Sequence, residues 1–167
     1  MTALMLSMLV VITSYQSPTV VDRVLATVNG EPVTQSDVRA VQLLELSPAA
    51  ADERDVVNLV IDRRLVRAEL RRFQVAQPDA GALAARLAAW RQRMGGDADA
   101  AFLRAGVDLR FVQQWLADEW REETYLQQRF AALAPERRVE AIRLWREGLR
   151  SRATITYRGS APSRSTR

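Results

Sequence analysis

Residues 20–38, which read VVDRVLATVNGEPVTQSDV, decide the fold. Apolar side chains alternate over residues 21–28, a pattern typical of a β-strand. One side of this strand carries Val24, Ala26 and Val28, and the other carries Arg23, Leu25 and Thr27. Asn29-Gly30 then tolerates the positive φ angles of a tight hairpin turn, and Pro32-Val33 forms a short return. Thr34 with Asp37 has the spacing of a helix cap. The stretch therefore predicts a strand, a turn, a short strand and a helix start.

Helical periodicity dominates the residues between this stretch and residue 150. Six segments are predicted to be helices. Five of them are residues 34–46, 52–73, 97–105, 108–133 and 136–150, and the third in chain order is a segment of about 15 residues that starts at Pro78-Asp79 and ends at Gly95-Gly96. The second of these has an apolar face wider than one stripe, which indicates packing on two sides. Residues 153–157 alternate again, with Ala153, Ile155 and Tyr157 on one side, and predict a closing strand.

The two predicted strands lie at opposite ends of a helical chain. Because an isolated strand is unstable, each needs a partner, and we expect residues 21–28 to pair with residues 153–157. The predicted fold class is therefore mainly α, with about six helices and a small sheet that pairs the N-terminal hairpin with the C-terminal strand.

The first 17 residues differ from the rest. Residues 3–12 are almost wholly apolar and are too few to span a bilayer comfortably, so we expect a secretory signal peptide over residues 1–17. An uncleaved anchor and a buried first element are the alternatives. A single domain is expected over residues 18–159, followed by a flexible tail over residues 160–167.

The composition excludes several kinds of chemistry. The chain has no Cys and no His, which removes thiol nucleophiles, the usual zinc ligands and Ser-His-Asp triads. All 24 basic residues are Arg, so no Lys is present to form a Schiff base. The net charge of +4 is modest and does not establish nucleic-acid binding. We expect no catalytic residue, no metal site, no cofactor and no nucleic-acid partner.

Two groups of charged residues are candidates for a binding or catalytic site. The carboxylates at 118, 119, 122 and 123 are interleaved with arginines and are expected to form a solvated helix face. The arginines at 63, 64, 67, 71 and 72 are interrupted by Glu69 and are also expected to be solvated, with contact to an acidic ligand or a membrane surface as the alternative. Asp62 is expected to form a structural ion pair.

Large aromatic side chains are numerous for a small helical domain. They are Trp90, Phe102, Phe111, Trp115, Trp120, Phe130 and Trp145. They are either ordinary core or the lining of a groove that holds extended apolar polypeptide. For the groove, the candidate client-binding residues are Trp90, Met94, Phe102, Phe111, Trp115 and Trp120.

Several segments together resemble the N-terminal domain of SurA-type periplasmic chaperones, many of which carry parvulin-type prolyl isomerase modules. The matching segments are DRV (22–24), VNGEPVT (28–34), SDV (36–38), VIDRRLV (60–66), AEL (68–70), FLRAG (102–106), LWREGLR (144–150) and ATI (153–155). Each segment is only moderately specific, and their order carries the resemblance. In that family an isomerase module commonly precedes the closing helix. Here Phe130 and Glu136 are six positions apart, which leaves no room for a module.

The resemblance implies ATP-independent binding of unfolded secreted or outer-membrane polypeptides, in the periplasm or outside the cell. It transfers no catalytic residue and no isomerase activity. We therefore expect a non-enzymatic chaperone, or holdase, whose membrane contact is limited to its N-terminal signal or an uncleaved anchor. The alternative is a non-catalytic adaptor or structural subunit that binds one dedicated partner, such as a separate prolyl isomerase. The sequence leaves the oligomeric state open.

Overall fold

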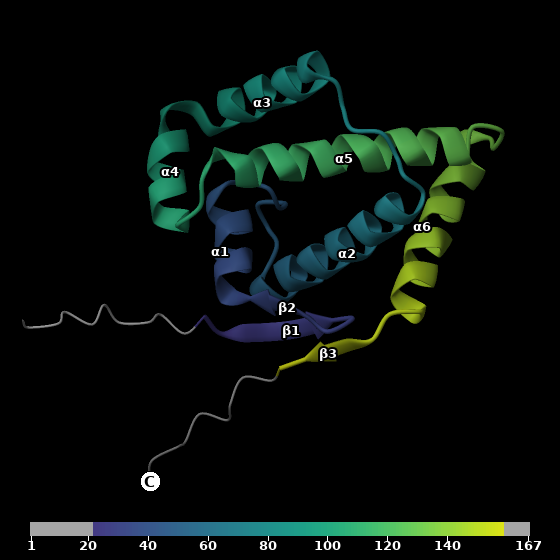
Figure 1. Cartoon of the computed structure of the whole chain (residues 1–167), viewed down its shortest axis with the longest axis horizontal. Helices are drawn as coiled ribbons and strands as arrows, with labels where there is room; N and C mark the ends of the chain where they lie inside the picture. The colour runs from purple at the N-terminus through teal and green to yellow at the C-terminus, as the bar shows by residue number, and fades with distance from the viewer. Residues whose placement is uncertain (1–21, 159–167) are drawn as a thin grey trace, which may run out of the picture.

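The computed structural model describes residues 22–158, which form a helical domain closed by a small sheet (Figure 1). The predicted signal peptide (1–17) and tail (160–167) lie outside the described residues. The strands are β1 (Val24–Val28), β2 (Glu31–Thr34) and β3 (Ile155–Tyr157). The helices are α1 (Gln35–Leu43), α2 (Glu53–Arg72), α3 (Ala80–Met94), α4 (Ala98–Ala105), α5 (Leu109–Arg129) and α6 (Pro135–Ser151), with a short 3₁₀ turn, η1 (Gly95–Asp97), between α3 and α4. The predicted mainly-α fold class is confirmed.

The sheet has the strand order β2-β1-β3, and both pairings are antiparallel. Asn29 and Gly30 have φ angles of 50° and 86°, as the predicted tight hairpin requires. On the other side of β1, Val28 lies opposite Ile155 and Ala26 lies opposite Tyr157. The expected pairing of the two ends of the domain is therefore confirmed.

The predicted alternation of β1 is wrong at its first residues. The register shifts between Val24 and Ala26, which is an irregularity of the bulge type. As a result Leu25 is buried together with Ala26 and Val28, whereas Val24 is only half-buried. Buried and half-buried side chains alternate with a period of two residues only in the part of β1 where the pairing is regular.

The predicted cap at the start of the first helix is confirmed. Thr34 and Asp37 form a capping box at α1, with the Asp37 N–H donating to Thr34 Oγ1 at 3.3 Å. At α2, α3 and α5 the side chains of Asp52, Asp79 and Asp108 each accept a hydrogen bond from a backbone N–H of the first turn.

Two helices end earlier than expected. α1 ends at Leu43 rather than residue 46, because Glu45 takes a φ of 50° and the Leu46 N–H returns to the Val41 carbonyl oxygen at 2.9 Å. α5 ends at Arg129 rather than residue 133. The connection to α6 is therefore residues 130–134, and α6 begins with Pro135 in its first turn.

Buried side chains form two clusters. The first joins the sheet to α2, α5 and α6, and α2 lies at its centre with neighbours on two sides, as its wide apolar face predicted. The second lies between α1, α3, α4 and α5. Figure 1 shows α3 lying along α5, α4 beside α1, and α6 running from the end of α5 down to β3. This path leaves α2, α5 and α6 facing one another.

Candidate functional site

Three of the six residues predicted to bind clients are buried in the core. Trp90 is 0% exposed, and its Nε1–H donates to the Leu44 carbonyl oxygen at 2.9 Å. Met94 lies in the same buried cluster, and Trp115 lies in the other one. A side chain enclosed in this way has no surface for a client, so the expected groove lined by these three residues is wrong. Their apolar area stabilises the fold.

The other three residues are half-buried: Phe102 and Phe111 pack against the second cluster, and Trp120 lies elsewhere. Phe102 packs on Trp90 with ring centroids 5.5 Å apart, and Phe111 stacks on Trp115 at 6.4 Å. Trp120 borders a different hollow, of about 360 Å³, next to Phe73. The six side chains therefore do not line one surface, because helical spacing aligns residues within a helix but does not set which helices face each other.

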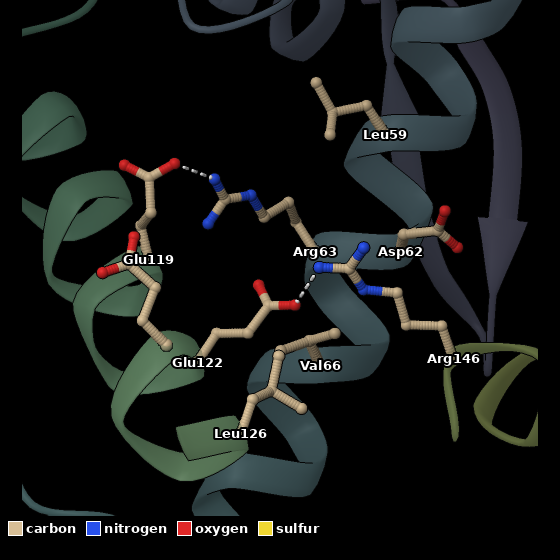
Figure 2. Close-up of a pocket in the computed structure, with 9 residues that line it drawn as sticks. Leu59, Asp62, Arg63, Val66, Glu119, Glu122, Leu126 and Arg146 are labelled. Atoms are coloured by element: carbon tan, nitrogen blue, oxygen red, sulfur yellow. Dashed lines mark hydrogen bonds and ion pairs between the residues drawn. The ribbon is translucent and has the colours of Figure 1, made fainter. Parts of the chain in front are cut away.

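A more extensive concave surface lies between α2, α5 and α6, and we call it the groove. Its inner part, between α2, α5 and α6, has a volume of about 260 Å³ and is shown in Figure 2. Its outer part, between α2 and α6, has a volume of about 580 Å³. Asp62 and Arg146 line both parts, which makes the two hollows adjacent.

Apolar side chains contribute to both parts of the groove. The inner part contains Leu59 and Val66 of α2 and Leu126 of α5. The outer part contains Val139 and Ile142 of α6, and Val139 is 72% exposed. Exposed apolar area in a concave site is typical of a surface that binds another molecule.

Ion pairs cross the groove from one helix to another. Figure 2 shows Arg63 Nη2 reaching Glu119 Oε1 at 2.8 Å and Arg146 Nη2 reaching Glu122 Oε1 at 2.7 Å. The Arg63 guanidinium also lies over the Trp115 ring, 4.5 Å from its centroid. These contacts hold the charged side chains to one another and leave the apolar side chains between them.

The outer end of the groove is tied together by Arg150 of α6. Its guanidinium pairs with Asp62, as expected for a structural ion pair, and donates to Asn58 Oδ1 at 3.2 Å. Burial lowers the pKa of Arg150, but the hydrogen bond and charge of Asp62 outweigh it and the net pKa is raised. The arginine is thus a permanent positive charge that joins α6 to α2.

The expected solvated faces are wrong for most of these charges. Asp118 is 4% exposed and pairs with Arg67 at 2.5 Å and with Arg121 at 3.4 Å. Arg63 and Glu122 are also mostly covered. Arg63 and Arg67 of α2 pair with Glu119 and Asp118 of α5 because the two helices pack face to face. The arginines of α2 and the carboxylates of α5 each recur at four-residue spacing, which indicates that each set shares one face of its helix. This spacing does not identify the helix against which that face packs.

The described part of the chain lacks both a helix that could span a membrane and a cluster of potential metal ligands. Residues 22–158 contain no helix with the length and apolar character needed to cross a membrane. The same residues hold no group of three or more side chains arranged to bind a metal ion.

Comparison with known proteins assigns neither a family nor a function to this chain. No protein-family model matches the sequence, and none of the curated proteins compared with it matches. The groove therefore has to be interpreted from its own residues.

Proposed function

We propose that this protein is an ATP-independent holdase that binds unfolded, apolar segments of other polypeptides in the groove between α2, α5 and α6. The observation that carries the proposal is the exposed apolar surface of α6 at the mouth of a concave site, with Val139 at 72% exposure. A client segment placed there removes apolar area from water on both molecules, which is favourable at roughly 25 cal/mol per Å².

The charged side chains of the groove suit such a ligand. Arg63, Arg146 and Arg150 already have carboxylate partners, so an apolar segment can approach without leaving a charge unpaired. The aliphatic stems of arginine side chains add further apolar surface. The groove therefore favours apolar segments without requiring a particular sequence.

The resemblance to SurA-type chaperones supports the same proposal, and with it we propose a location in the periplasm or outside the cell. The connection over residues 130–134 is too short to contain a folded module, so we propose binding without prolyl isomerase activity. Sequestering exposed apolar segments slows aggregation by lowering the concentration of free unfolded client.

Aggregation of an outer-membrane β-barrel protein diluted from urea tests the proposal by light scattering without ATP. We expect wild-type protein in several-fold excess to suppress aggregation, and Val139→Asp to weaken suppression because it places a charge among the apolar side chains of the groove. Leu144→Asp is the matched control: Leu144 is 53% exposed on the same helix and does not line the groove. No suppression by wild-type protein, or equal loss in both variants, contradicts the proposal. A complex of fixed stoichiometry with one partner, without general suppression, favours the adaptor.

A further inference from the structure

β3 forms one edge of the sheet, and its backbone groups alternate in direction. The Arg158 N–H donates to the Leu25 carbonyl oxygen at 2.8 Å, and the Thr154 carbonyl oxygen accepts from the Asn29 N–H at 2.9 Å. Residues 154, 156 and 158 therefore face β1. Because alternate residues of a strand direct their backbone groups to opposite sides, the N–H and C=O groups of Ile155 and Tyr157 face away from it.

We propose that this edge binds an extended segment of the client as an additional strand. Within residues 22–158, nothing pairs with the outward backbone groups of Ile155 and Tyr157. Unpaired backbone donors and acceptors at strand spacing are complementary to another extended backbone, whatever its side chains. The inference rests on the proposed holdase function and names the conformation of its substrate.

The opposite edge of the sheet does not offer the same surface. β2 contains Pro32, which has no N–H to donate. The Pro32 carbonyl oxygen accepts a hydrogen bond from Arg64 Nη1 at 2.6 Å. One edge is thus blocked by its sequence and by an arginine from α2, while the β3 edge remains open among the described residues.

The open edge lies next to the groove. The Tyr157 hydroxyl donates to Asn58 Oδ1 at 2.7 Å, and Arg150 Nη2 donates to the same oxygen at 3.2 Å. Asn58 and Arg150 line the outer part of the groove. A client strand on β3 therefore runs beside the outer groove, which can take apolar side chains from one face of that strand.

Charge at the edge favours acidic over basic client segments. Arg152 precedes β3 and Arg158 follows it, and both are exposed. Among the described residues, neither pairs with a carboxylate within 4.0 Å. The client that fits is an extended segment with alternating apolar residues and acidic flanks.

Fluorescence anisotropy with the full chain tests this inference. The probe is a labelled peptide of about six residues that alternates Tyr and Thr between flanking Glu residues, a common strand length. Its matched control carries N-methyl groups on the amides of alternate residues, which removes backbone donors from one edge of the strand. Methylation of alternate amides can fall on either edge of the peptide strand. We expect the peptide that is methylated on the edge facing β3 to bind at least tenfold weaker than the unmodified peptide, since each lost hydrogen bond weakens binding by about fivefold.

A protein variant tests the same contact from the other side. Tyr157→Pro removes the outward N–H and leaves the hydrogen bonds of residues 156 and 158 to β1 in place. Tyr157→Ala is the control, because it removes the same side chain and keeps the N–H. We expect Tyr157→Pro to bind the unmodified peptide about fivefold weaker than Tyr157→Ala, with equal thermal melts for the two variants.

The outcomes separate this inference from the proposed function. Equal affinity for all the peptides, together with suppression of aggregation, overturns the edge inference and leaves the holdase proposal standing. Absence of both peptide binding and suppression overturns both. A dimer that Tyr157→Pro dissociates without affecting peptide binding assigns the edge to a second copy and also overturns the inference.

Discussion

Asn29 and Thr154 exchange two hydrogen bonds across 125 positions of sequence. The Asn29 N–H donates to the Thr154 carbonyl oxygen at 2.9 Å, and the Thr154 N–H donates to Asn29 Oδ1 at 3.0 Å. The hairpin turn between β1 and β2 is therefore also the point at which the C-terminal strand begins its pairing. The same asparagine has a φ of 50°, which only a few residue types adopt at little cost.

Substitutions of Asn29 separate its two contributions. Asn29→Gly keeps the positive φ and removes the side-chain hydrogen bond, so we expect a loss of about 0.5–1 kcal/mol in the free energy of unfolding. Asn29→Ala adds the cost of positive φ and should lose about 2 kcal/mol. Urea denaturation measures both values. Equal losses for the two substitutions would show that the positive φ angle of residue 29 contributes nothing to the free energy of unfolding.

A charge at the buried C-terminal end of β1 should destabilise the domain. Val28 is buried opposite Ile155, and Val28→Asp places a carboxylate there without a partner, at a cost of about 3 kcal/mol or more. Val24→Asp should cost less, because Val24 is half-buried beside the strand irregularity. Thermal melts followed by circular dichroism compare the two. An unchanged melt for Val28→Asp would argue against the β1–β3 closure.

The buried carboxylate of Asp118 should contribute more to stability than any exposed ion pair. It accepts from Arg67 at 2.5 Å, and Gln114 also donates to it at 3.0 Å. Asp118→Ala leaves the buried guanidinium of Arg121 without its carboxylate, and we expect a loss of about 3 kcal/mol. Arg143→Ala, which breaks pairs on the exposed face of α6, should leave urea unfolding unchanged. Similar effects for both substitutions would refute this ranking.

Asp22 should make stability depend on pH in the acid range. Hydrogen bonds from the Ser36 hydroxyl and then from Thr34 hold the pKa of Asp22 below its ordinary value of 3.8. Because the folded-state pKa is lowered, the stabilisation is complete above pH 3.8 and is lost as the pH falls through the folded pKa. Titration by NMR should show this low pKa, and Ser36→Ala should raise it. An Asp22 pKa of 3.8 that Ser36→Ala does not change contradicts the contact.

The closure of the fold was predictable because its signals are local. Asn29-Gly30 favours a turn, and Thr34 with Asp37 marks where the first helix begins. Only residues 21–28 and 153–157 alternated as strands, so each was the other's available partner. The irregularity after Val24 carried no such signal, because a register shift arises from pairing with β2.

The candidate site was less predictable because it depends on how helices face one another. Trp90 has the same helical spacing whether it lines a groove or fills a core, and only the packing of α3 on α5 decides that it is buried. Arg63 and Arg67 of α2 were expected to be solvated, and the packing of α5 supplied their partners. Nothing in the sequence distinguishes Val139, because a single exposed valine on a helix is ordinary.

Site-specific photo-crosslinking to an unfolded client tests the central claim most directly. A photoreactive amino acid is placed at Val139 in the groove or at Leu144, which lies outside it on the same helix, and crosslinking is measured with an outer-membrane β-barrel protein diluted from urea. Both positions are exposed, so both labelled proteins should fold. We predict strong crosslinking from position 139 and little from position 144. Equal crosslinking from both positions, or none from position 139, would contradict the groove as the client-binding site.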